Sequence, residues 1–215
     1  MSKFVISTDD EEIQYLRNCD KRLARVINSI GDIECSIHDN GYEFIIFQII
    51  GQMLSNKVAD VLVNRLLEKC NNEITPHKII NMGVQELRNI GVSNAKAEYI
   101  LNFSQMVNSK EIDLVELENL NDRDVIVKLT QIRGIGTWTA KMYLLFVLRR
   151  EDILPHEDGA FLQSFKWLYK LEEYNKQSIE KKCKKWKPYS SYAARYLYRA
   201  LDMGLTKNPF HLYKN

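Results

Sequence analysis

Apolar residues recur at steps of three and four positions along most of the chain, the spacing of helices that bury one face. Residues 10–30 keep this spacing and stop at Gly31, so a single helix is predicted there. Residues 42–70 begin with a segment that is apolar nearly all round, which predicts a buried helix. Small and polar residues at 51–55 then predict a short break, followed by a second helix that Ser55 caps.

The remaining predicted helices are separated by capping residues and by glycine or proline. They cover residues 74–82, 84–90, 94–108, 112–120, 125–131, 138–148, 161–170, 174–186 and 192–203. An irregular connection is expected at 31–41 and a loose tail at 208–215. No clear alternation of apolar and polar residues over more than four positions stands out, so no strand is expected. The sequence therefore predicts an all-α fold of about twelve helices with short connections.

Residues 129–148 combine two apolar helix patterns with a glycine-rich turn between them. Arg133 precedes the turn, which consists of Gly134, Ile135 and Gly136. Because glycine has no Cβ, the backbone of such a turn can approach a phosphate closely. The N–H groups that begin the second helix also favour an anion. We interpret the pattern as a helix-hairpin-helix that grips the DNA backbone; the alternative is an ordinary corner in an all-α core.

A carboxylate and an aromatic side chain accompany this turn. Asp158 follows the apolar turn that ends at Pro155 and precedes a predicted helix, so it is well placed to be an N-cap. A helix N-terminus also keeps a carboxylate ionised, which suits a group that must face developing positive charge. Trp138 lies in the first turn of the second hairpin helix, where it can fill the core or stack on a base. Both alternatives stay open for each residue.

Composition sets outer limits on the kind of protein. The 215 residues are 45% hydrophobic, enough for the core of one large domain or two small ones. No run of eighteen apolar residues is present and the acidic N-terminal segment lacks an apolar core, so neither a transmembrane helix nor a signal peptide is expected. The cysteines are too scattered for a zinc or iron–sulfur site and are expected to be reduced thiols: Cys19, Cys35, Cys70 and Cys183.

Positive charge is concentrated towards the C-terminus. Residues 162–215 carry 12 Lys and Arg against 4 Asp and Glu, whereas residues 1–161 carry 18 against 24. Aromatic residues are interleaved with these charges at 186–192 and 195–199. Such interleaving fits phosphate contact together with base stacking. The alternative is a lysine-rich helix face exposed to water.

Four blocks of sequence resemble the helix-hairpin-helix superfamily of DNA glycosylases, most closely the DNA-3-methyladenine glycosylase II family. The blocks are residues 49–55, 87–97, 129–158 and 186–194, in the family's order. The resemblance implies a two-lobed helical glycosylase fold in which residues 1–215 form one unit. It places a central lobe at approximately 42–155, with the hairpin at 129–148, and a second lobe at approximately 1–41 and 156–215. The chain resembles the compact form of the family, without the N-terminal β domain of the longer bacterial members.

The resemblance also implies roles for individual residues. Asp158 matches the family's essential aspartate, and Met53, with Leu54 as second choice, falls at the residue that wedges into the duplex. The residues implied in the base pocket are Trp138, Tyr198, Met142 and Gln52, of which Met142 stands where some members have a tyrosine. The residues implied in DNA backbone contact are Gly134, Gly136, Thr137 and Arg133.

One position distinguishes two kinds of enzyme within this superfamily. Members that also cut the DNA strand carry a lysine two residues after the second hairpin glycine, and this lysine forms a Schiff base. Trp138 occupies that position here. Lys141 lies three residues further along, nearly a full helical turn away, and is not expected to replace it. The resemblance therefore implies a monofunctional enzyme.

The expected function is base excision repair of alkylated purines of the 3-methyladenine type, by base flipping and hydrolysis of the N-glycosidic bond. The alternatives are the same fold acting on oxidised or mismatched bases, and a non-catalytic helix-hairpin-helix protein that only binds DNA. The expected partner is double-stranded DNA with a damaged base. No membrane, no metal and no cofactor are expected, with a monovalent cation at the hairpin left open. We expect a monomer, cytoplasmic and nucleoid-associated if bacterial and nuclear if eukaryotic.

Overall fold

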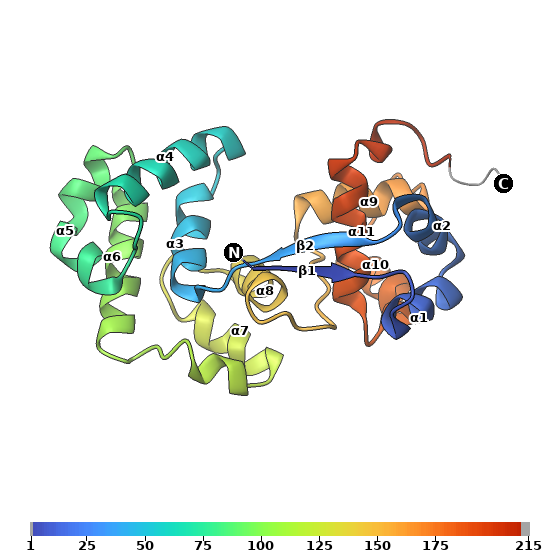
Figure 1. Ribbon diagram of the computed structural model, residues 1–215, viewed down its shortest axis with the longest axis horizontal. Helices are drawn as coiled ribbons and strands as arrows, with labels where there is room; N and C mark the ends of the chain where they lie inside the picture. The colour runs from blue at the N-terminus through green and yellow to red at the C-terminus, as the bar shows by residue number, and fades with distance from the viewer. Residues whose placement is uncertain (1, 212–215) are drawn as a thin grey trace. The chain divides into compact units, whose positions relative to one another are not determined.

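The computed structural model describes residues 2–211 and is mainly helical, as the sequence predicts (Figure 1). Part of the expected tail, residues 212–215, lies outside the described residues. The chain forms two compact units: unit 1 comprises Met1–Ile37 and Arg149–Asn215, and unit 2 comprises His38–Leu148. None of the helices in the described part of the chain is long and apolar enough to span a membrane.

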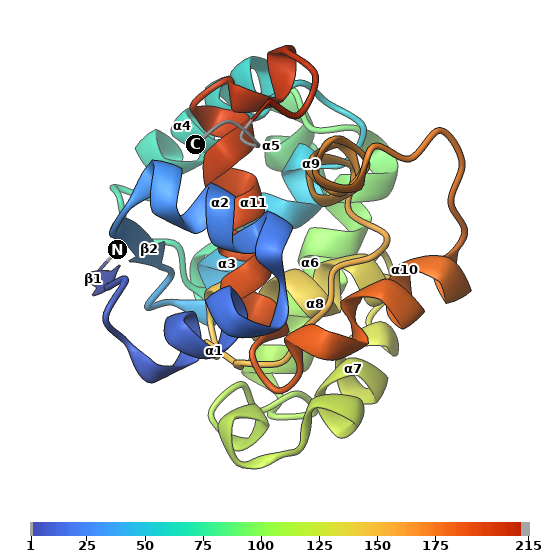
Figure 2. The same ribbon diagram turned by 90° about the vertical axis from the view of Figure 1, so that its right-hand side faces the viewer.

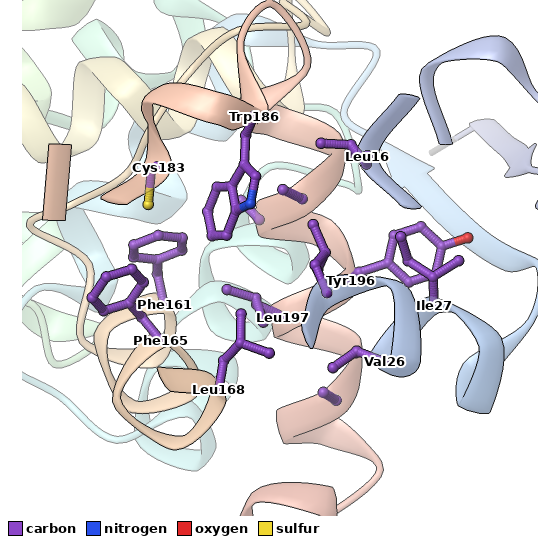
Figure 3. Close-up of a cluster of buried hydrophobic side chains, with 14 of the residues drawn as sticks. Leu16, Val26, Ile27, Phe161, Phe165, Leu168, Cys183, Trp186, Tyr196 and Leu197 are labelled. Carbon is purple, nitrogen blue, oxygen red and sulfur yellow. The ribbon is translucent and has the colours of Figure 1, made fainter. Parts of the chain in front are cut away.

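Unit 1 is built around its last long helix. Its elements are β1 (Ser2–Ile6), α1 (Glu11–Cys19), α2 (Lys21–Ile30), β2 (Ile33–Ile37), α9 (Gly159–Tyr169), α10 (Lys176–Cys183), α11 (Ser190–Asp202) and the 3-10 turns Lys184–Trp186 and Leu205–Lys207. Helix α11 packs against both α2 and α9 (Figure 2). Apolar side chains from these helices gather around Trp186, which Phe161 meets edge-on with ring centroids 6.4 Å apart (Figure 3).

The small sheet of unit 1 corrects the expectation of a protein without strands. Strands β1 and β2 pair antiparallel, with Ser2 opposite Ile37 and Ile6 opposite Ile33. The irregular connection expected at 31–41 is therefore wrong over the residues of β2. Ile33, Cys35 and Ile37 do alternate with polar residues over five positions, and the two isoleucines are buried. A two-stranded ribbon is only marginally stable on its own, but this one packs on a helical core. A short alternating segment is therefore enough to form it.

The single helix predicted at residues 10–30 is divided in two at Asp20. This residue has an extended backbone, and its Oδ1 accepts hydrogen bonds from the N–H groups of Arg22 and Leu23 at the start of α2. Its Oδ2 accepts from the Tyr169 hydroxyl, from Trp186 Nε1 at 2.9 Å and from Lys185 Nζ at 2.9 Å. Only 2% of the residue is exposed. The carboxylate thus ties the start of α2 to the end of α9 and to the turn after α10.

Unit 2 is helical throughout its described residues. Its elements are α3 (Gly41–Gly51), α4 (Asn56–Lys69), α5 (Pro76–Asn89), α6 (Asn94–Asn108), α7 (Asp122–Thr130), α8 (Thr137–Phe146) and the 3-10 turn Glu116–Asn119. The break predicted at 51–55 separates α3 from α4, and α5 is kinked at Gly83, between the two helices predicted at 74–82 and 84–90. Helix α3 lies in the core, where Tyr42 and Phe103 stack with ring centroids 5.3 Å apart.

We expect replacement of Asp20 to destabilise unit 1. Burial alone would raise the pKa of this carboxyl, but hydrogen bonds from Tyr169, Lys185 and Trp186 outweigh that effect, so its pKa lies below its ordinary value of 3.8. Asp20→Asn keeps a capping oxygen but removes the charge that these donors stabilise. Losing one partner of a buried ionic network typically costs about 3 kcal/mol of unfolding free energy. Denaturant unfolding at pH 7 measures this loss.

The pH dependence of the unfolding free energy follows from the same Asp20 carboxylate. A carboxyl whose pKa is lowered on folding stabilises the fold above its ordinary pKa, and this stability is lost as pH falls through the lowered value. The difference in unfolding free energy between wild type and Asp20→Asn should therefore shrink as the pH falls below 3.8. Asp9→Asn, which changes an exposed aspartate, is the matched control and should unfold like the wild type. A difference that grows in acid would contradict the role given to Asp20.

Candidate functional site

The hairpin turn of unit 2 is fixed by a contact that only glycine permits. Gly134 has a φ of +90°, which residues with a side chain rarely adopt, and a Cβ added there would lie 2.7 Å from Cγ of the Tyr99 ring. The Gly134 carbonyl accepts a hydrogen bond of 2.8 Å from Gln52 Nε2. The guanidinium of Arg133 lies over the Tyr99 ring, 5.4 Å from its centroid. The turn is therefore held by two neighbouring side chains, those of Tyr99 and Gln52.

The second glycine of the turn opens the start of α8 to a ligand. Gly136 is the N-cap of α8, and both it and Thr137 are exposed. A Cβ added at Gly136 would meet nothing within 4 Å, and Gly136 has no side chain with which to cap this helix. The first N–H groups of a helix have no partner within the helix. The start of α8 thus has the geometry and the partial positive charge to bind an anion.

The loop between α3 and α4 presents an apolar residue to the surface. Met53 has a left-handed backbone, with φ +57°, and its side chain is fully exposed; Leu54 is exposed too. Lys96 Nζ donates to the carbonyls of Ile50 at 2.8 Å and Gln52 at 2.6 Å. Loss of solvation lowers the pKa of Lys96. A left-handed, fully exposed methionine on a loop that is held this firmly is consistent with the predicted role of Met53, which stays a prediction.

Two of the residues predicted in the base pocket lie one turn apart on α8. Trp138 is half-buried in the first turn of the helix, and Met142 follows it four positions later, on the same face. Only 4% of Met142 is exposed. Gln52, the third predicted pocket residue of this unit, hydrogen-bonds the hairpin turn and so joins the turn to the loop of Met53.

Asp158 and Tyr198 lie together in unit 1. Asp158 is the N-cap of α9: its Oδ1 accepts a 2.8 Å hydrogen bond from the N–H of Phe161, and 9% of the residue is exposed. The capping role expected from the sequence is confirmed. Burial first, and the neighbouring Asp158 carboxylate second, raise the pKa of the Tyr198 hydroxyl above its ordinary range. An aromatic residue and a carboxylate from distant parts of the chain therefore meet here.

The structure gathers the predicted site residues into two groups, one in each unit. Unit 1 holds Asp158 with Tyr198. Unit 2 holds the hairpin, the loop of Met53 and the α8 face of Trp138; the role of each residue in binding or catalysis stays a prediction. Sequence reasoning missed Tyr99 and Lys96, since nothing local shows what a distant aromatic or lysine will contact. Residues 2–211 contain no cluster of three or more histidine, cysteine, aspartate or glutamate residues suited to a metal.

The chain is similar to a described superfamily and to several known proteins. The model of the HhH-GPD superfamily of base excision DNA repair proteins matches residues 46–188. The alkylbase DNA glycosidase-like protein mag2 of Schizosaccharomyces pombe is 28% identical over 193 residues, which cover 86% of this chain and 91% of that protein.

Two solved structures resemble the fold over nearly its full length. The DNA-3-methyladenine glycosidase of Bacillus halodurans matches with a TM-score of 0.86 and 32% identity, covering 99% of this chain and 97% of that one. The 3-methyladenine DNA glycosylase Mag1 of Schizosaccharomyces pombe, solved in complex with abasic DNA, matches with a TM-score of 0.82 and 26% identity, covering 94% of this chain and 99% of that one. The chain therefore belongs to the HhH-GPD superfamily of base excision DNA repair proteins.

Proposed function

We propose that this protein is a monofunctional DNA glycosylase that removes alkylated purines of the 3-methyladenine type from double-stranded DNA. The observation that carries the proposal is the Asp158 carboxylate, largely buried at the start of α9 and next to Tyr198. The names of the similar proteins from Bacillus halodurans and Schizosaccharomyces pombe support the substrate class. The proposal involves no cofactor, and a monovalent cation at the hairpin stays a prediction.

DNA binding is assigned to the hairpin and to the loop of Met53. The exposed N–H groups at Gly136 and Thr137 bind a backbone phosphate, with Arg133 adding positive charge beside them. Met53 enters the space that the extruded nucleotide leaves in the duplex. Extrusion costs a few kcal/mol and costs least for a damaged base, so this step already selects for lesions.

Chemistry is assigned to Asp158. Alkylation at N3 or N7 gives the purine a positive charge, so the base can leave with the electron pair of the N-glycosidic bond. An aromatic face, which Trp138 offers in unit 2 and Tyr198 in unit 1, favours such a cationic base. The sugar C1′ develops oxocarbenium character, which the ionised Asp158 stabilises. Water then adds to C1′ and loses a proton, leaving an abasic site and the free base.

The same mechanism leaves the DNA strand intact. Strand cleavage by this superfamily needs an amine that forms a Schiff base with C1′. Trp138, in the first turn of α8, stands at the position of that lysine, and Lys141 lies three residues further along the helix. The lyase reaction is therefore absent from the proposed activity.

The first test is release of free 3-methyladenine from methylated duplex DNA without strand cleavage or borohydride trapping. Asp158→Asn should lower the single-turnover excision rate about 10²–10³-fold, because a preorganised charge at the reacting centre contributes that much. Asparagine is also a good N-cap, so the variant should fold and still bind DNA.

Asp202→Asn, which changes an exposed aspartate at the end of α11, is the matched control and should excise like the wild type. Full activity of Asp158→Asn would remove this residue from the mechanism. A wild-type protein that binds DNA tightly but releases no base from a panel of single-lesion duplexes would instead indicate a binding protein without chemistry.

A second test separates the effect of backbone strain at Met53 on stability from the effect of its side chain on excision. Met53→Gly relieves the strain of the left-handed backbone. The unfolding free energy of the variant should therefore equal that of the wild type or exceed it by up to about 1 kcal/mol. Its excision from duplex DNA should fall roughly tenfold or more, because a wedge helps to offset the few kcal/mol of extrusion.

Met53→Ala keeps the strained backbone and loses the wedge, so it is the control for the stability gain. Excision of a lesion in single-stranded DNA needs no wedge and should change little in either variant. An equal loss of excision from single-stranded and duplex DNA would contradict the wedge assignment.

A third test uses the two hairpin glycines, which differ in their surroundings. Gly134→Ala should destabilise the protein by roughly 2 kcal/mol, because the residue would be strained and would overlap the Tyr99 ring. Gly136→Ala should melt close to the wild type but bind DNA roughly tenfold more weakly, since its methyl group occupies the open space that a phosphate must enter. Thermal unfolding and equilibrium DNA binding of both variants measure this; unchanged affinity of Gly136→Ala would exclude the turn as the phosphate site.

A further inference from the structure

A strongly basic pocket lies in unit 1, and none of the residues assigned above to DNA binding or to chemistry lines it. Its volume is about 420 Å³, and it forms where α1 passes into α2, beside the end of α9 and the α10 segment. Its lining contains four basic side chains and one carboxylate: Cys19, Asp20, Lys21, Arg22, Tyr169, Lys182 and Lys185. A cavity of this size admits a small ligand or one group of a larger one.

Three of the cations converge on the ring of Tyr169. Lys182 Nζ lies 4.5 Å from the ring centroid, Lys185 Nζ 5.4 Å and the Arg22 guanidinium 5.9 Å. Each is attracted by the aromatic face, whereas like charges gathered at one ring also repel one another. Negative charge bound nearby would offset this repulsion.

Asp20 cannot supply that compensation alone. Its two oxygens already accept five hydrogen bonds, and Lys185 is the basic side chain that forms an ion pair with it. Neither Lys21 nor Lys182 lies within ion-pair distance of a carboxylate in residues 2–211. The four basic side chains of the pocket therefore outnumber its one carboxylate, and the pocket presents excess positive charge to the solvent.

We propose that this pocket binds a phosphate group and that the group belongs to the backbone of a DNA strand. Lysine ammonium groups donate strong, charge-assisted hydrogen bonds to phosphate oxygens and attract them as compact positive charges. Lys181 and Lys184, the next basic residues on α10 and its following turn, are exposed, so positive charge continues beyond the pocket as a polyanion would require. The choice of DNA as the source rests on the proposed function, whereas the phosphate chemistry rests on the pocket alone.

The salt dependence of DNA affinity tests the proposal. Each backbone phosphate bound contributes about 0.9 to the slope of log K against log salt concentration. The double variant Lys21→Gln with Lys182→Gln should therefore bind undamaged duplex DNA more weakly than the wild type, with a slope smaller by about 1. Lys110→Gln with Lys207→Gln removes the same charge from exposed positions outside the pocket and should leave the slope unchanged. Circular dichroism and thermal unfolding confirm that both double variants fold.

A second arm separates the two sources of phosphate. Inorganic pyrophosphate should raise the melting temperature of the wild type and of the control but not of the pocket variant. Loss of this response together with the change in DNA slope supports the proposal. Loss of the pyrophosphate response with an unchanged DNA slope assigns the pocket to a small polyphosphate and overturns the DNA assignment; loss of neither overturns the site. Both arms use undamaged DNA or no DNA, so they remain decisive even if the protein excises no base.

Discussion

The missing side chain at Gly134 is the constraint on which the candidate interface of unit 2 depends. Because no Cβ stands between them, the backbone passes directly over the Tyr99 ring, and the Gly134 carbonyl comes within reach of Gln52. Gln52 belongs to the loop of Met53, which Lys96 holds by two further carbonyls. The turn and the exposed methionine are therefore positioned by one connected set of contacts. Such preorganisation lowers the entropy that binding must otherwise overcome.

Three helix N-termini in this protein show how one physical effect can serve different ends. At α2, Asp20 supplies the capping oxygen and also accepts hydrogen bonds from two buried aromatic side chains and from Lys185, so its charge is used by the fold. At α9, Asp158 caps the helix and lies beside the buried hydroxyl of Tyr198. At α8, Gly136 leaves the first turn without a side-chain cap. The uncapped terminus suits an external anion, and the capped ones stabilise internal carboxylates.

Local patterns predicted the fold and part of the site. The break at 51–55, the hairpin at 129–148 and the cap at Asp158 all follow from short-range preferences that the structure keeps. The division of the first long helix at Asp20 could not be predicted, because the donors that hold this carboxylate come from residues far along the chain. The same holds for Tyr99, whose contact with the hairpin depends on how α6 packs. The strand at 33–37 carried a local signal, but one of only five residues.

The number of charged residues near the C-terminus does not show where a ligand binds, and the structure shows why. Several lysines near the C-terminus are taken up by carboxylates: Lys176 pairs with Glu180 and Lys187 with Asp152. Others converge on the Tyr169 ring at an open pocket. A count of charges treats these two groups alike, although only at the pocket do several basic side chains gather around one carboxylate. A binding surface therefore differs from a solvated helix face because its like charges are held close together despite their mutual repulsion. The tertiary fold decides which charges are held in this way.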